Sequence, residues 1–133
     1  MASSKLEEHY RRYIGYLNER KTHDLSDFVH DELTYNDKPM SRADYQKYIG
    51  DDIARIPDLY FDIHHLLVSG DYVSSRIRFK CTPVKEFRGH SPNGQTISFV
   101  EHVFYRFEDG KIRQVWSLLD DQAIATQLGK PGL

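Results

Sequence analysis

Cysteine is almost absent from this sequence, and long apolar runs are lacking. The single cysteine, Cys81, excludes a disulfide within the chain. No apolar run approaches the roughly 20 residues that a membrane-spanning helix needs, and the first residues lack the charged and then apolar pattern of a signal peptide. We therefore expect a soluble cytoplasmic protein that does not act at a membrane.

Neither sign of charge predominates, and the usual motifs of metal and nucleotide sites are missing. Eighteen Lys and Arg stand against 20 Asp and Glu, with no sustained basic run, so nucleic acid is not an expected partner. The seven histidines form no helical His-x-x-x-His pair, and His64-His65 point to opposite faces of a predicted strand. No glycine-rich loop precedes a helix. We expect neither a metal nor another cofactor.

Aromatic residues are abundant in a chain that fits one domain. The length of 133 residues predicts a single domain over 1–133 that buries a substantial core. Nine Tyr, seven Phe and one Trp are distributed along it. They indicate an aromatic core or a pocket for a flat organic ligand, and the two interpretations are compatible.

The first half of the chain has helical periodicity. Apolar residues at helical spacing predict a helix over 4–20, a short second helix over 24–31 and a third helix over 41–56. Pro57 ends the third helix, because the residue before a proline is disfavoured in helical geometry. A brief extended segment is expected at 33–35.

The second half changes to a period of two, which is typical of strands. Asp109-Gly110 lies between two alternating runs and predicts a tight hairpin turn. A short helix should follow at 121–127. The strands are expected at 59–69, 72–82, 95–107 and 111–119.

This order of elements predicts an α+β fold. Three N-terminal helices have apolar stripes to bury, and a curved, mainly antiparallel sheet has one apolar face to receive them. Such a sheet leaves a cone-shaped cavity at its open end, which suits a small-molecule site.

Asp120, at the end of the last strand, is the first candidate for chemistry. In an unbulged strand it shares a face with Ile112, Gln114, Trp116 and Leu118. Burying an acid on such a face costs free energy unless the carboxyl has hydrogen-bond partners or a functional role. It could cap the terminal helix. Alternatively, Asp121 could be the cap while Asp120 points inward, where desolvation would raise its pKa and make it a stronger base.

Glu101 and His102 are polar residues in the middle of an apolar strand. Either could belong to a site, and either could be a hydrogen-bonded core group. In an unbulged strand the two side chains point to opposite faces of the sheet. This alternation does not show which face holds the cavity. Arg76 and Arg78 are interpreted as a solvated sheet face.

A set of short motifs is spread over roughly 10–129. They are Ile56-Pro-Asp-Leu59, Gly70-Asp-Tyr-Val73, Arg76, Thr82, Glu86-Phe-Arg-Gly89, Pro92-Asn-Gly94, Phe107-Glu-Asp-Gly-Lys-Ile112, Trp116, Asp120 and Gln127-Leu-Gly129. The most specific part is the spacing near the end, where Asp-Gly-Lys-Ile is followed by Trp116, by Asp120 after three intervening residues, and by Gln-Leu-Gly after another six residues. Together these motifs resemble the SnoaL-like polyketide cyclase family, which belongs to the NTF2-like superfamily of cone-shaped α+β proteins.

The resemblance implies a cofactor-free enzyme for a polyketide-like substrate. In the cyclases, an Asp at the position of Asp120 removes a proton beside a carbonyl, and the enolate closes an intramolecular aldol. His102 or Arg106 would then polarise a carbonyl. Glu101 would contact the substrate, and the pocket would be shaped by Tyr35, Phe104 and Trp116.

Some residues depart from the family pattern, so two other functions stay open. Cys81-Thr-Pro83 replaces a common Gly-Thr-His, Gln114 replaces a frequent Glu, and Phe104 is apolar where relatives place a polar ligand contact. The chain could instead catalyse a ketosteroid-isomerase-like proton shift, or bind a ligand or serve as a dimeric adaptor without catalysis. We expect a homodimer that forms through the sheet.

Overall fold

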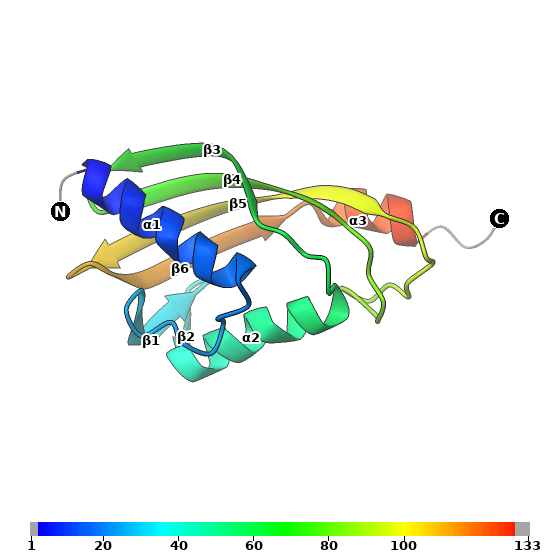
Figure 1. Ribbon diagram of the computed structural model, residues 1–133, viewed down its shortest axis with the longest axis horizontal. Helices are drawn as coiled ribbons and strands as arrows, with labels where there is room; N and C mark the ends of the chain where they lie inside the picture. The colour runs from blue at the N-terminus through cyan, green and yellow to red at the C-terminus, as the bar shows by residue number, and fades with distance from the viewer. Residues whose placement is uncertain (1–2, 130–133) are drawn as a thin grey trace.

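One helix, α1 (Ser3–Asn18), lies across the inner face of a twisted sheet in the computed structural model, which describes residues 3–129 (Figure 1). Its buried stripe has the spacing expected of an amphipathic helix. This stripe consists of Leu6, Tyr10, Tyr13, Ile14 and Leu17. The helix predicted over 4–20 is therefore confirmed, with an end two residues earlier than expected.

The segment after α1 differs from the prediction. Residues 24–28 form a turn segment that leads into β1 (Val29–Tyr35), so the short helix expected over 24–31 is wrong. The spacing of the apolar residues in this segment is compatible with one turn of helix and also with the start of a strand. Pairing decides between them, because β1 runs parallel to the last strand and Ile112 N donates to Phe28 O at 2.7 Å.

A short hairpin and the second helix follow. β2 (Lys38–Ser41) pairs antiparallel with β1 and leads into α2 (Arg42–Arg55). Ser41 caps α2, since its hydroxyl accepts a hydrogen bond from Asp44 N at 3.0 Å. The helix ends before Pro57, as the sequence predicts.

Four long strands and a terminal helix complete the described chain. They are β3 (Asp62–Ser69), β4 (Tyr72–Cys81), β5 (Ile97–Glu108), β6 (Lys111–Leu119) and α3 (Asp121–Leu128). The sheet order is β2-β1-β6-β5-β4-β3, and only the β1–β6 pairing is parallel among the described strands. The α+β fold class is confirmed. Within residues 3–129 there are three helices, but the third follows the sheet.

A β-bulge in β6 decides which side chains face the core. Phe107 is opposite Ile112 and Arg106 is opposite Gln114, so Arg113 is an additional residue in β6. Ile112 is consequently buried in the core, whereas Gln114 lies on the outer face with Arg106. The unbulged alternation considered from the sequence is therefore wrong for Ile112.

The two faces of the sheet differ in character. On β4, Val73, Ser75 and Ile77 are buried, while the intervening Arg76 and Arg78 are not. On β5 the odd-numbered side chains likewise face inward, and all of them except the partly exposed Glu101 are buried. No helix within residues 3–129 is long and apolar enough to cross a membrane.

Candidate functional site

A cavity of about 70 Å³ lies on the inner face, between the two N-terminal helices and the sheet. Apolar and aromatic groups form most of its wall, as is usual for small-molecule pockets. It is much smaller than the 300–1,000 Å³ of a typical ligand pocket. The wall is formed by Tyr13, Leu17, Tyr35, Tyr45, Tyr48, Ile49, Asp52, Leu59, Phe61, Ile77, Phe79, Phe87, Phe99, Glu101, Val103, Tyr105, Val115 and Leu119.

Glu101 is the carboxyl group that β5 directs into this cavity. It occupies an odd-numbered position between the buried Phe99 and Val103, which places it on the inner face. The hydroxyl of Ser117, opposite Val103 on β6, donates a hydrogen bond to Glu101 Oε2. Burial raises the pKa of Glu101 and outweighs this hydrogen bond, which acts in the other direction.

Phenol groups share the cavity wall with Glu101. The hydroxyls of Tyr13 on α1 and Tyr45 on α2 lie 2.6 Å apart, so one donates to the other. Tyr35 on β1 lies beside Tyr45 and Tyr48, with ring centroids 6.1 and 5.4 Å away. Burial raises the pKa of Tyr13, Tyr35 and Tyr45, so these phenols stay protonated and can act as hydrogen-bond donors.

A second carboxyl group, Asp52, lines the cavity from the last turn of α2. Burial raises its pKa, although Arg55 acts in the opposite direction from 3.3 Å. The charge on Asp52 also contributes to the raised pKa of Glu101. The cavity therefore contains two acids with raised pKa values, as is common where side chains exchange protons with a ligand.

Among the residues predicted for the site, the structure places Glu101 and Tyr35 at this cavity. His102, the neighbour of Glu101, lies on the outer face and is exposed. Its Nε2 lies 2.6 Å from Arg76 Nη1, and Arg76 Nε donates to His64 Nδ1 at 3.2 Å. The alternation of side chains along a strand separates Glu101 from His102, but it does not show which of them faces the interior.

Phe104 and Trp116 also lie on the outer face. They are directly opposite each other on β5 and β6, and Phe104 is 52% exposed. Trp116 Nε1 donates to Asp37 Oδ1 at 2.9 Å, at the turn between β1 and β2. Neither side chain lines the inner cavity.

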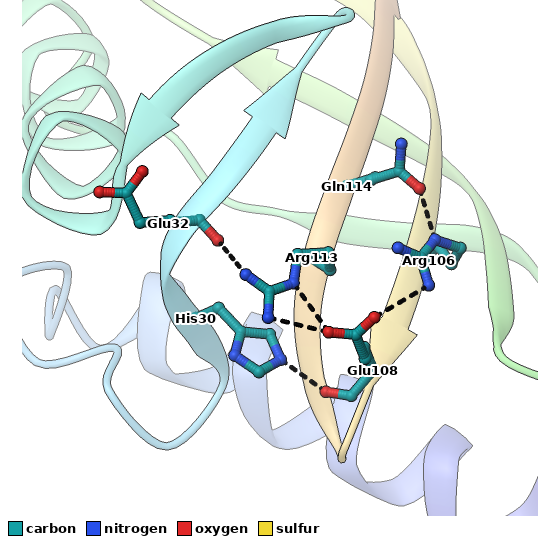
Figure 2. Close-up of polar contacts among 6 residues, drawn as sticks. All are labelled: His30, Glu32, Arg106, Glu108, Arg113 and Gln114. Carbon is teal, nitrogen blue, oxygen red and sulfur yellow. Dashed lines mark hydrogen bonds and ion pairs between the residues drawn. The ribbon is translucent and has the colours of Figure 1, made fainter.

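Arg106 belongs to a polar network at the hairpin end of the sheet, shown in Figure 2. It donates to Gln114 Oε1 and lies 3.6 Å from Glu108 Oε1. Arg113 donates to the same carboxylate at 2.8 and 3.1 Å. These contacts tie β5 to β6 beside the bulge and place Arg106 away from the cavity wall.

Asp120 caps α3. Its Oδ1 accepts a hydrogen bond from Ala123 N at 3.0 Å, and its side chain is exposed. It lines two hollows that also include the outward residues Arg76 and Val100, and it is not part of the inner cavity wall. Asp121, which was the expected cap in the inward-pointing interpretation, instead forms an ion pair with Arg88.

Sequence reasoning missed Asp52 and the phenols of the two N-terminal helices. Helical spacing places Tyr13 and Tyr45 on the apolar faces of their helices, which agrees with their burial but does not reveal the role of their hydroxyls. Asp52 lies between the apolar Ile49 and Ile53 of α2, and an acid within an apolar stripe was the available signal. Among the described residues, no group of three or more His, Cys, Asp or Glu is placed to hold a metal ion.

Comparisons with known proteins agree with this architecture. The sequence model of the SnoaL-like polyketide cyclase family matches residues 7–128. A SnoaL-like polyketide cyclase from Agrobacterium tumefaciens is 38% identical, with a TM-score of 0.88 over 96% of this chain and 98% of that one. TsrD from Streptomyces laurentii has a TM-score of 0.87 at 21% identity, over 97% and 98% of the two chains, which shows a shared fold. No curated protein matches this chain.

Proposed function

The chain belongs to the SnoaL-like polyketide cyclase family, and from this membership we propose that it is a cyclase or isomerase acting without a cofactor on a carbonyl-rich small molecule. The observation that carries the proposal is Glu101, a carboxyl with a raised pKa that faces a cavity lined by phenols. Acid/base catalysis is most effective when the pKa of the catalytic group lies near the working pH.

Glu101 is the proposed acid/base. Its carboxylate removes a proton from the carbon beside a carbonyl, and the electron pair of that C–H bond forms an enolate. A hydroxyl of the Tyr13–Tyr45 pair donates to the enolate oxygen. In an isomerisation, the protonated Glu101 returns the proton to another carbon. In a cyclisation, the enolate carbon attacks a second carbonyl of the same molecule, and the new alkoxide takes the proton.

Asp120 is the second candidate for the acid/base, because the resemblance places the family's catalytic Asp there. Its exposed position and its hydrogen bond to Ala123 N favour a capping role. For Asp120 to act, a substrate would have to occupy the hollow beside Arg76 and Val100 instead of the inner cavity. Variants of the two acids therefore distinguish the two sites.

Hydrogen exchange in ethyl acetoacetate tests the proton-removal step without knowledge of the natural substrate. Its central carbon lies between two carbonyls, as in a polyketide, and NMR in heavy water measures the loss of that hydrogen above the buffer background. We expect catalysed exchange in the wild type and in Asp51→Asn, and its loss in Glu101→Gln. Loss in Asp120→Asn with retention in Glu101→Gln would assign the reaction to Asp120.

Ligand binding without catalysis is the second candidate function. The cavity of about 70 Å³ favours it, because it leaves little room for a large reacting substrate. The capping role of Asp120 also favours it, because it gives this carboxylate a structural task instead of a catalytic one. Absence of exchange in the wild type, together with measurable binding of small aromatic ligands, would establish this function instead.

We also propose that the protein forms a homodimer through the outer face of the sheet. Three large apolar side chains on that face, Leu67, Phe104 and Leu118, are each more than half exposed. Exposed apolar patches on soluble proteins commonly mark interaction surfaces.

A further inference from the structure

A long loop joins β4 to β5 over residues 82–96 and supplies Phe87 to the wall of the inner cavity. Its ring centroid lies 5.8 Å from that of Phe99. Within residues 84–96, Phe87 is the one buried side chain. Loops longer than about 12–15 residues without secondary structure are uncommon in compact domains, and many of them are lids over active sites. The central part of this loop is held against the cavity by a single large apolar group.

The tip of the loop is a strained turn. Phe87 and His90 exchange two backbone hydrogen bonds, at 2.9 and 3.0 Å. Between them, Arg88 and Gly89 have φ values of 51° and 84°, the positive signs of a primed turn. Glycine adopts this conformation without strain, whereas arginine does so at a cost. The turn therefore needs a stabilising contact at Arg88.

That contact is an ion pair with α3. The guanidinium of Arg88 donates to both carboxylate oxygens of Asp121, from Nη2 at 3.0 Å and also from Nε. The hydrogen bonding raises the pKa of Arg88 and lowers that of Asp121, so both groups stay charged. A second contact with α3 follows, because Asn93 Nδ2 donates to Gln127 O at 3.1 Å.

The ion pair lies at the mouth of the cavity. Burial raises the pKa of Asp52 and Glu101, and the positive charge of Arg88 acts against this on both, so Arg88 is close to the two acids. Asp121 follows two residues after Leu119 of the cavity wall. The wall residues that are at least partly exposed mark the opening; they are Tyr35, Tyr48, Asp52, Phe61, Glu101 and Leu119.

Both ends of the loop are fixed to the rest of the protein. The hydroxyls of Thr82 and Thr96 lie 2.8 Å apart and share a hydrogen bond. Val84 N donates to Arg55 O at the end of α2, also at 2.8 Å. The central part of the loop can therefore move without a change in the sheet.

We propose that the loop over residues 82–96 is a lid on the inner cavity and that the ion pair between Arg88 and Asp121 is its latch. When the pair separates, the strained turn relaxes and Phe87 leaves the wall, which opens and enlarges the cavity. The closed volume of about 70 Å³ then sets no limit on the size of a ligand. The opening itself is independent of the proposed function, but its use in admitting a substrate rests on that function.

Amide hydrogen exchange, followed by NMR, measures the opening. The amides of Phe87 and His90 are protected by their mutual hydrogen bonds, and their exchange reports the population of the open state. Asp121→Asn and Arg88→Gln should each speed this exchange about threefold, as is typical of an exposed ion pair. The double variant should exchange no faster than either single variant. Unchanged exchange in the single variants, or additive effects in the double variant, would overturn the latch.

A matched control and salt separate the latch from a general loss of charge. Asp62→Asn removes another exposed ion pair, with Arg78 at 3.2 Å, and should leave exchange at Phe87 unchanged. Raising the NaCl concentration to about 1 M should accelerate this exchange in the wild type, because salt screens the pair. It should have no such effect in Asp121→Asn. Salt-independent exchange in the wild type would contradict the latch.

Nile red tests whether the loop covers the cavity. This uncharged dye is too large for a cavity of about 70 Å³, so it should bind only after Phe87 has left the wall. Its affinity should rise in Asp121→Asn by the same factor as the amide exchange, since apparent affinity follows the open population. In Phe87→Ala, binding should be stronger than in the wild type and should no longer respond to Asp121→Asn.

Equal affinity in the wild type, Asp121→Asn and Phe87→Ala, including no binding in all three, would refute the lid. Neither amide exchange nor dye binding depends on catalysis. The lid can therefore be confirmed even if the protein fails to exchange hydrogen in ethyl acetoacetate, which separates its failure from that of the proposed function.

Discussion

Glu101 and His102 illustrate how far a single residue can be interpreted from sequence. Their opposite orientations follow from strand geometry, and the structure confirms that they lie on different faces. Which face is inner depends on where α1 and α2 pack, and no local pattern contains that information. The same limit applies to Asp120, because its local sequence is compatible both with a helix cap and with an acid that points inward.

The capping role of Asp120 predicts how its variants affect stability. Asp120→Ala should lower the free energy of unfolding by about 1 kcal/mol, because Ala123 N loses its acceptor. Asp120→Asn should leave it nearly unchanged, since Asn caps helices as well as Asp does. Urea denaturation of both variants measures this difference. Equal stability of the Ala variant and the wild type would show that the cap contributes nothing in solution.

The raised pKa of Glu101 predicts a pH-dependent cost to folding. The folded state holds the proton more tightly than the unfolded chain, whose carboxyl has an ordinary pKa of 4.5. Stability from this group is therefore complete below that value and falls as pH rises through the higher folded pKa. Glu101→Gln removes the titration, so its stability relative to the wild type should increase with pH. Urea titrations at several pH values would test this, and a constant difference would contradict the prediction.

At the scale of elements, local chemistry predicted the terminal hairpin but not the β-bulge beside it. Asp109 and Gly110 have φ values of 53° and 78°, as a tight primed turn requires. The additional residue Arg113 is fixed by contacts with Glu108 and the carbonyl of Glu32, which belongs to a distant strand. The incorrect helix over 24–31 has a similar cause, because pairing with β6 overrides a local helical pattern.

Two glycines with different roles test the importance of the hairpin. Gly110→Ala should reduce the free energy of unfolding by about 1 kcal/mol, because an L-residue is strained at positive φ. Gly15→Ala is the control: this glycine lies within α1, and an added Cβ would meet nothing within 4 Å. That variant should gain about 0.5–1 kcal/mol from improved helix propensity. Thermal or urea denaturation compares them, and a neutral Gly110→Ala would contradict the primed-turn assignment.

At the scale of the whole molecule, the sheet separates two surfaces with different proposed roles. The inner face, covered by α1 and α2, holds the cavity and its acids. On the outer face, one row runs across four strands from Leu67 through Ser74 and Phe104 to Trp116. Alternating polarity and family resemblance predicted this two-sided sheet. The volume of the cavity could not be predicted, because it depends on how side chains from distant elements interdigitate.

Self-association through the outer face is the prediction that belongs to the whole molecule. Leu118 is 74% exposed and lies opposite His102, beside the row that contains Phe104. A two-fold interface would bury these apolar groups against their own copies. Leu118→Glu should then convert a dimer to a monomer while leaving hydrogen exchange in ethyl acetoacetate unchanged, because the inner cavity is on the other side of the sheet. Val84→Glu is the control, since Val84 is 55% exposed in the loop after β4. Analytical ultracentrifugation over a range of concentrations measures the mass, and a monomeric wild type or a dimeric Leu118→Glu would refute this interface.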